Sequence, residues 1–114
     1  MRKACGLSEK TLEAAKKGLP RSLYAVSLRS SGKLIGTGRI VGDGLHVQVV
    51  DIAVHPDFQK RGLSKQILQR IVAYAETQVP KCAVVSLFAD VDWLYEKFGF
   101  GKPERSVGMF YKRD

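Results

Sequence analysis

Hydrophobic residues recur along the chain with two different periods. Four apolar runs enriched in β-branched residues predict β-strands, at residues 23–29, 33–41, 45–55 and 83–88. Short glycine-containing turns at residues 30–32 and 42–44 separate the first three runs, which predicts an antiparallel meander. Cys82 is expected to begin the fourth strand, in the core. From Phe100 onward the chain is expected to return to a strand that ends with Met109, Phe110 and Tyr111.

Helical periodicity appears in three places. Apolar residues spaced three and four apart predict a long helix with one buried face, formed by Leu63, Ile67, Leu68, Ile71, Val72 and Ala75. A shorter helix is predicted from an N-cap at Ser8 to a stop at Gly18 and Pro20. A third covers residues 92–98. Because the long helix links the third and fourth strands, those two strands are predicted to be parallel.

The strongest chemical signal lies at residues 49–68, where a strand leads through a loop into the long helix. The apolar run before Pro56 suits a strand buried on both faces, and the proline should end it. The first N–H groups of a helix lack intrahelical partners and carry partial positive charge. Gly62 lets an anion approach the backbone, and Lys60 and Arg61 add positive charge. This pattern predicts an anion site, although a solvated helix start has the same pattern.

Two motifs resemble those of the GCN5-related N-acetyltransferase (GNAT) family. Gln59, Gly62 and Ser64 are similar to the family signature Q/R-x-x-G-x-G/A, which wraps the pyrophosphate of acetyl-coenzyme A (acetyl-CoA). Ser64 replaces the usual Gly or Ala, and its small size should be tolerated. The run WLYEKFGF at residues 93–100 resembles the family's LYEKLGF. The motifs come in the family's order, and the resemblance covers roughly residues 23–111.

The resemblance implies an α+β fold with α/β/α layers. The expected sheet is mixed and mostly antiparallel, with a parallel, splayed strand pair and helices on both faces. The strands expected to part are those at residues 45–55 and 83–88. Relative to the family, the chain is expected to be N-terminally shortened, because a first strand and one N-terminal helix are not evident. A single GNAT-like domain over residues 1–114 is expected.

The resemblance also implies an enzyme, an N-acetyltransferase that moves an acetyl group from acetyl-CoA to a primary amine by direct attack. The pantetheine arm would pair with main-chain groups in the strand gap, much as an added strand does. The phosphates would lie on the loop and the helix start. The cofactor-binding residues so implied are Ile52, Ala53, Val54, Gln59, Lys60, Arg61, Gly62, Leu63 and Ser64.

Three chemical needs follow from that reaction. The developing oxyanion needs a donor, for which the N–H of Val54 is a candidate. The departing thiolate can take a proton from Tyr95, which fits this role by its motif position. A phenol with a pKa near 10 is roughly matched to a thiol leaving group. The alternative for Tyr95 is a core aromatic residue, because it shares a helical face with its apolar neighbours.

The third need, a group that takes the proton of the amine, is less evident. Gln48 stands where the family often has Glu, and an amide cannot take a proton. Asp51 is the nearest carboxylate on the strand and is the second predicted catalytic residue. It would accept the proton, directly or through water, or attract a cationic acceptor. The alternative is an ion pair with Arg39. Phe88 falls where the family often has an Asn that contacts pantetheine, so that contact is expected to be missing.

Composition narrows the classes of function. The formal net charge is +8, and the cations are dispersed, with no basic run of five or more. This distribution disfavours nucleic-acid binding and fits a ligand with three phosphate groups. No apolar run approaches the ~20 residues of a membrane span. Cys5 and Cys82 have no metal-ligand spacing and are predicted to be reduced thiols of a cytoplasmic protein.

Two competing functions remain. A non-catalytic acetyl-CoA-binding or regulatory module is favoured by Gln48 and by the shortened N-terminus. A basic nucleic-acid-binding domain comes third. For the enzyme, the acceptor is either a small-molecule amine or a protein amine, and a homodimer is left open. No metal is expected.

Overall fold

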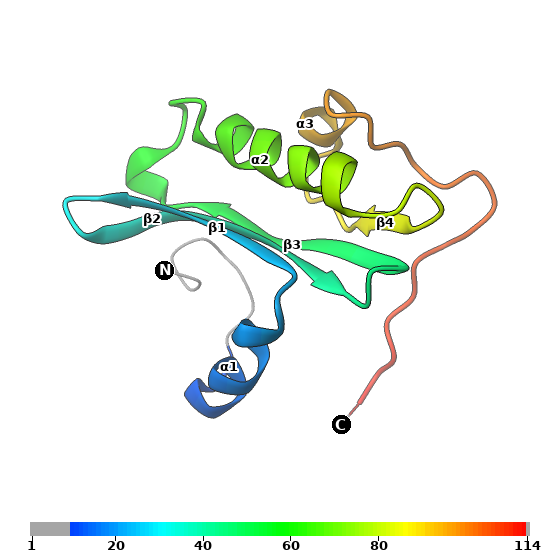
Figure 1. The fold of residues 1–114 in the computed structure, drawn as a ribbon. Helices are drawn as coiled ribbons and strands as arrows, with labels where there is room; N and C mark the ends of the chain where they lie inside the picture. Colours follow the sequence, from blue (N-terminus) through cyan, green and yellow to red (C-terminus); the bar gives the residue numbers. More distant parts are fainter. Residues whose placement is uncertain (1–9, 114) are drawn as a thin grey trace.

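The protein is built on one four-stranded sheet, seen in a computed structural model that describes residues 10–113 (Figure 1). The strands lie in the order of the chain: β1 (Tyr24–Ser30), β2 (Lys33–Gly42), β3 (His46–Val54) and β4 (Val84–Leu87). The first three strands pair antiparallel, and β4 pairs parallel with β3. The predicted meander and the predicted parallel pair are both confirmed.

Helices lie on both faces of the sheet. α2 (Leu63–Gln78) and α3 (Asp92–Glu96) lie on one face, and α1 (Leu12–Gly18) lies on the other (Figure 1). Two single 3-10 turns, η1 (Leu19–Arg21) and η2 (Pro56–Phe58), precede β1 and α2. The predicted α+β architecture of a mixed sheet between helices is therefore confirmed.

The core lies between α2 and the sheet. Ile67, Leu68 and Ile71 of α2 are completely buried, as the periodicity predicts. Ile67 and Ile71 pack in one core cluster with buried residues of β1, β2 and β3. A Cβ atom at Gly38 would lie 2.7 Å from the side chains of both Ile52 and Ile67. This glycine therefore lets α2 approach the sheet closely.

A β-bulge interrupts β3 at Asp51. Thr37 of β2 pairs with Ala53, whereas Arg39 pairs with Val50, so two residues of β3 stand opposite one residue of β2. Asp51 has a left-handed φ of 57°, which is uncommon for a residue with a side chain. A bulge bends its strand and increases the local twist. The part of β3 after Asp51 is therefore redirected relative to the part before it.

β3 extends beyond the end of β4. The parallel pairing runs from His46 with Val84 to Val49 with Leu87. β4 ends at Leu87, whereas β3 continues to Val54. Within the sheet of the described residues, the last part of β3 has no strand on its β4 side. This is the parting of strands that the family resemblance implies.

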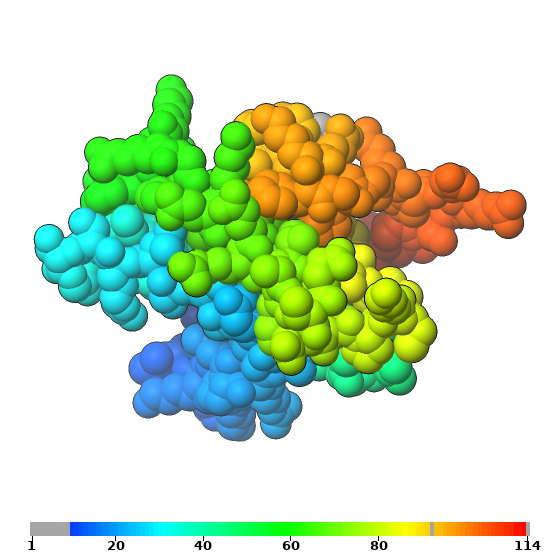
Figure 2. Space-filling view, turned by 45° about the horizontal axis from the view of Figure 1, so that its top comes forward, coloured from blue at the N-terminus to red at the C-terminus, as the bar shows by residue number. Residues whose placement is uncertain are grey.

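The expected C-terminal strand is absent. Residues 101–113 form no strand, and their side chains are exposed. Figure 2 shows this orange-to-red segment projecting from the body of the molecule. The apolar residues from Val107 to Tyr111 predict a strand by composition, but a strand needs a partner edge in register. Instead, this segment contacts Phe88, the residue after β4: the rings of Phe88 and Phe110 lie 5.1 Å apart, and Gly108 lies against the Phe88 ring.

The predicted starts of the fourth strand and of the first helix also differ from the structure. Cys82 is exposed and lies in a turn before β4, where the N–H of Ala83 donates to the Pro80 carbonyl at 3.0 Å. It is therefore not part of a core strand. The predicted N-cap Ser8 lies outside the described residues. In the structure, Oγ1 of Thr11 caps α1 by accepting from the N–H of Ala14 at 3.1 Å.

Candidate functional site

The free edge of β3 presents main-chain groups to the gap beyond β4. The N–H of His55 donates to the carbonyl of Ile35 in β2 at 2.7 Å. The N–H and C=O groups of successive residues in a strand point in alternate directions, so those of Val54 point away from β2. They therefore face the open edge. An extended chain that contains amides can pair with such an edge as an added strand does.

The side chain of Gln59 connects this edge to the loop that follows. Its Nε2 atom donates to the Val54 carbonyl at 3.0 Å. The contact holds the loop after η2 against the end of β3. The two parts of the predicted cofactor site, the loop and the strand edge, are thus brought together. Sequence reasoning assigned Gln59 to the loop but did not foresee that it contacts Val54.

The loop before α2 has the conformation of an open anion cradle. Lys60 and Gly62 have left-handed φ angles of 66° and 76°. Gly62 is the N-cap residue of α2, and no side chain caps this helix end. A Cβ atom at Gly62 would meet no atom within 4 Å, so the approach to the backbone is open. The guanidinium of Arg61 lies 5.2 Å from the centre of the Phe58 ring.

Tyr95 comes from α3, on the same side of the sheet as α2. Its ring meets the ring of Phe100 edge-on, with centroids 6.3 Å apart. Burial raises the pKa of the Tyr95 phenol, and the negative charge of Asp90 raises it further. The phenol therefore stays protonated at neutral pH. Among the side chains described in α3, Leu94 is buried and Tyr95 is half-buried.

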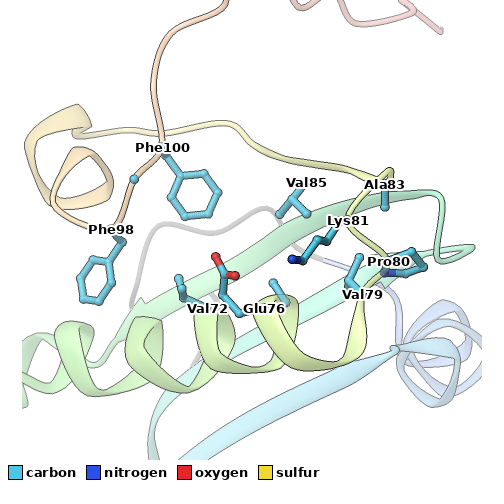
Figure 3. A pocket seen from close by; sticks show the side chains of 11 residues that line it. Val72, Glu76, Val79, Pro80, Lys81, Ala83, Val85, Phe98 and Phe100 are labelled. Atoms are coloured by element: carbon cyan, nitrogen blue, oxygen red, sulfur yellow. The ribbon is translucent and has the colours of Figure 1, made fainter.

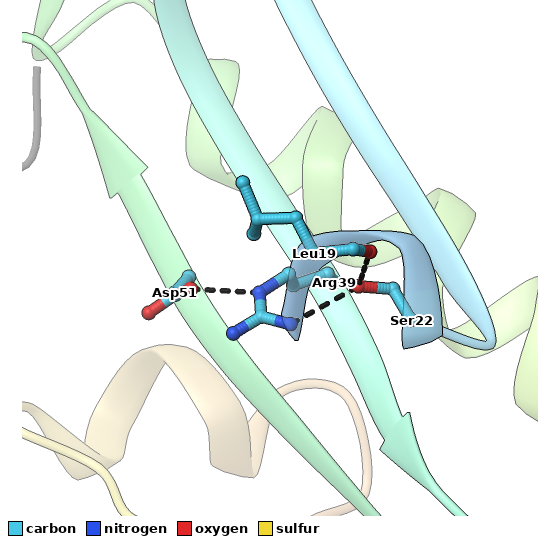
Figure 4. Close-up of polar contacts among 4 residues, drawn as sticks. All are labelled: Leu19, Ser22, Arg39 and Asp51. Carbon is cyan, nitrogen blue, oxygen red and sulfur yellow. Dashed lines mark hydrogen bonds and ion pairs between the residues drawn. The ribbon is translucent and has the colours of Figure 1, made fainter. Parts of the chain in front are cut away.

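Asp51 forms the ion pair that the sequence left open. Nε of Arg39 donates to Oδ2 of Asp51 at 2.8 Å, and the two side chains are 21% and 13% exposed. Nη1 of Arg39 also donates to the Ser22 hydroxyl at 3.0 Å, and this hydroxyl donates to the Leu19 carbonyl at 2.8 Å (Figure 4). Arg39 precedes the buried Ile40 in β2, so this network lies on the face that α2 does not cover.

We expect Asp51→Asn to lower the stability of the fold. The amide keeps the size of the side chain but removes the charge that balances the partly buried Arg39. The expected loss is on the order of 1–3 kcal/mol. Thermal melts of the wild type, Asp51→Asn, Arg39→Gln and the double variant give the coupling energy of the pair. A catalytic base would instead lower kcat and change the acidic limb of the rate profile, and cation attraction would raise KM with a salt-sensitive defect. Either result with an unchanged melt contradicts a purely structural role.

Among the described residues, two cavities share the turn that follows α3. One, of about 360 Å³, lies between the C-terminal end of α2 and the Phe98–Phe100 turn, with Glu76 and Lys81 projecting into it (Figure 3). The other, of about 870 Å³, is lined by the end of β4, by α3 with Tyr95, and by residues 99–103. Sequence reasoning did not foresee this second cavity, because the segments that line it meet only in the fold.

A family model described as an acetyltransferase (GNAT) domain matches residues 20–102, which include both motifs. The chain belongs to the GNAT family. The match covers the whole sheet, the anion cradle and α3, so the family and the geometry concern the same residues.

Similar proteins agree with this assignment. A protein of unknown function from methicillin-resistant Staphylococcus aureus, described as a probable acetyltransferase, is 43% identical, and its structure superposes with a TM-score of 0.90 over 98% of this chain and 87% of that one. The uncharacterized N-acetyltransferase ycf52 of Porphyra purpurea is 32% identical over 93% of this chain and 64% of its own length. The chain thus spans less than two thirds of that relative.

A second solved structure shares the fold at low identity. It is a predicted acetyltransferase from Clostridium acetobutylicum, solved with acetyl-CoA, and is 14% identical with a TM-score of 0.68 over 92% of this chain and 79% of that one.

Two further observations concern the GNAT chain itself. No helix within residues 10–113 has the length and apolar character needed to cross a membrane. In the same residues, no group of three or more His, Cys, Asp or Glu side chains could hold a metal ion.

Proposed function

We propose that this GNAT protein is an acetyl-CoA-dependent N-acetyltransferase that acts on a primary amine. The hydrogen bond from Gln59 to Val54 carries the proposal, because it joins the anion cradle to the open edge of β3. A ligand with phosphates at one end and an amide-rich arm at the other needs both features side by side. Coenzyme A has this chemistry.

The residues present fit acetyl-CoA at both ends. Open space in front of Gly62 and the uncapped N-terminus of α2 suit the pyrophosphate, and Lys60 and Arg61 supply positive charge. Leu63 and Ser64 contribute main-chain N–H groups of the first helical turn. Of the predicted strand residues Ile52, Ala53 and Val54, it is Val54 whose main-chain groups would hold a pantetheine amide along the strand edge, whereas Ala53 pairs with Thr37 of β2. When bound, acetyl-CoA supplies an activated acetyl thioester.

The chain's own groups have separate tasks in the transfer. The N–H of Val54 would stabilise the developing oxyanion. The phenol of Tyr95 would donate a proton to the departing thiolate, and its raised pKa keeps that proton available. Asp51, predicted to accept the amine proton or to attract a cationic acceptor, is paired with Arg39 on the face of the sheet that α2 and Tyr95 do not cover, so a direct role in the transfer is not part of the proposal.

The other assignments are part of the same proposal. Residues 1–114 are taken as a single GNAT domain whose acceptor is a small-molecule or protein amine. The exposed thiol of Cys82 fits a reducing compartment such as the cytoplasm. A non-catalytic acetyl-CoA-binding module is the second candidate, and Gln48 favours it because that position in β3 offers no carboxylate base.

A broad amine panel tests the function. Transfer releases free coenzyme A thiol, so a thiol-reactive dye follows every acceptor in one format. We expect turnover with a subset of amines and none with the matched alcohols. Calorimetry with acetyl-CoA runs in parallel. Binding without turnover on any amine would replace the enzyme by the non-catalytic module, and salt-dependent binding to DNA or RNA without acetyl-CoA binding would overturn both.

A further inference from the structure

The bulge in β3 decides which main-chain groups of this strand face the gap. Before the bulge, the carbonyl of Leu45 accepts from the N–H of Val84, at the start of β4, at 2.8 Å. Main-chain groups alternate in direction along a strand, so the odd-numbered residues before the bulge point toward β4. After the bulge, the N–H of His55 points toward β2 and bonds Ile35, so the even-numbered Val54 points toward the gap. Without the bulge, the N–H of Val54 would point toward β2.

The bulge makes the same change for the side chains. Val47 and Val49, which precede it, are buried in the core cluster with α2, and so is Val54, which follows it. Odd-numbered residues of one half of β3 and even-numbered residues of the other half thus pack against the same helix. Gly38 of β2 stands opposite the bulge and leaves the space that the side chain of Ile52 fills. The core therefore supports the bulge on the face that α2 covers.

On the other face, an ion pair holds the residue that has the left-handed backbone. Asp51 has a φ of 57°, which glycine adopts freely, asparagine and aspartate adopt occasionally, and other residues adopt only at a cost. Its carboxylate accepts from Nε of Arg39 at 2.8 Å. Nη1 of Arg39 donates to the hydroxyl of Ser22, which is itself bonded to the Leu19 carbonyl of η1 (Figure 4). The guanidinium is therefore held from two sides and anchors the side chain of Asp51.

Resting on the proposed function, we propose that Arg39 and Asp51 are positioning residues of the acetyl-CoA site. Their ion pair holds the left-handed backbone of the bulge, and the bulge turns the N–H and C=O of Val54 toward the gap. The hydrogen bond from Gln59 to the Val54 carbonyl depends on the same orientation. Neither side chain of the pair is assigned a contact with acetyl-CoA or with the acceptor. The site needs the backbone conformation of Asp51, and the carboxylate serves to hold that conformation.

Three substitutions of Asp51 separate the backbone conformation from the carboxylate. Asp51→Gly, Asp51→Asn and Asp51→Ala all remove the charge, but only alanine strongly disfavours the left-handed φ. By calorimetry on the folded variants, we expect Asp51→Gly and Asp51→Asn to bind acetyl-CoA nearly as tightly as the wild type. Asp51→Ala should bind it about five- to thirtyfold more weakly than Asp51→Gly, because the cost of the left-handed conformation is then paid on binding.

Combined variants test the part played by Arg39. Arg39→Gln should weaken acetyl-CoA binding in the otherwise wild-type chain, because the hold on Asp51 is lost. It should cause no further loss in Asp51→Gly, since glycine needs no partner to keep a left-handed backbone. The matched control is Arg29→Gln, which removes the same charge from an exposed side chain of β1 and should leave the affinity unchanged.

A measurement without ligand tests the orientation of Val54 directly. By NMR, the coupling across the hydrogen bond between the His55 nitrogen and the Ile35 carbonyl carbon reports that His55 points toward β2, and hence that Val54 points toward the gap. We expect this coupling in the wild type, in Asp51→Gly and in Asp51→Asn. In Asp51→Ala it should be weaker or absent.

Two results would overturn the positioning role. An equal loss of acetyl-CoA affinity in all three Asp51 variants would assign the effect to the carboxylate itself. A lower melting temperature of Asp51→Ala, with unchanged affinity and an unchanged coupling between His55 and Ile35, would leave the ion pair a structural role alone. If the wild type does not bind acetyl-CoA, the proposed function fails, and the coupling still decides whether residue 51 orients Val54.

Discussion

Replacing Gly62 by Asp should weaken acetyl-CoA binding at least about fivefold. The new carboxylate would stand in the open space before the N-terminus of α2, where the pyrophosphate is proposed to lie. Two unit charges ~4 Å apart repel by roughly 1–4 kcal/mol between bulk water and a protein surface. Each 1.4 kcal/mol is about tenfold in affinity. Isothermal titration calorimetry with the folded variant measures the effect directly.

The matched control for Gly62→Asp is Gly62→Asn. Asn has the size of Asp, tolerates the left-handed φ of 76° comparably, and carries no charge. We expect it to bind acetyl-CoA more tightly than Asp does, and the difference isolates the charge effect. Because a Cβ atom meets nothing within 4 Å, both variants should fold. Unchanged affinity in folded Gly62→Asp would remove the anion cradle from the site.

Tyr95→Phe should lower kcat on the order of 10²-fold, because a general acid typically contributes 10²–10⁴-fold. The substitution deletes the phenolic hydroxyl and keeps the ring that packs against Phe100. Acetyl-CoA affinity should therefore be retained. Steady-state kinetics together with calorimetry separate the two effects. An unchanged kcat, with chemistry shown to be rate-limiting, would assign Tyr95 to packing alone.

The pH dependence gives a second test of Tyr95. An acid must be protonated, so its contribution is complete below its pKa and is lost as the pH rises through it. Burial and the charge of Asp90 raise that pKa above the ordinary value of 10.0, so the alkaline limit of the rate should lie above pH 10. Asp90→Asn removes one of the two causes and should move the limit to lower pH. The Tyr95→Phe variant should not show this alkaline limit, because it has no phenol to ionise.

The sheet could be predicted from the sequence because its signals are local. Apolar runs give β1 to β4, glycine turns give the meander, and the long helix between β3 and β4 requires a parallel pair. The C-terminal segment could not be predicted in the same way. Its apolar residues from Val107 to Tyr111 have the composition of a strand, but whether a strand forms depends on a partner edge in another part of the chain.

The site was predictable in part for the same reason. The anion cradle is a continuous stretch, so Gly62 and its neighbours could be read from the motif. The bulge at Asp51 could not, since nothing in the local sequence requires a left-handed residue there. The cavity beside Tyr95 is formed by β4, α3 and the residues after Gly99, and only the fold brings these together. The roles of Asp51 and Tyr95 stay predictions until the variants are measured.

The short pairing of β4 has a consequence for how the protein folds and opens. β1 and β2 meet at Ser30 and Lys33, close in sequence, whereas the first pair of β3 and β4 joins His46 to Val84. Closing a long chain segment costs more entropy, so the meander should form before β4 docks. β4 has four residues at the edge of the sheet, and Val84 is 50% exposed. Its amide protons should exchange with solvent through local opening, faster than those of β2. The pairing of β4 with β3, which borders the gap, would therefore form last during folding and break first on opening.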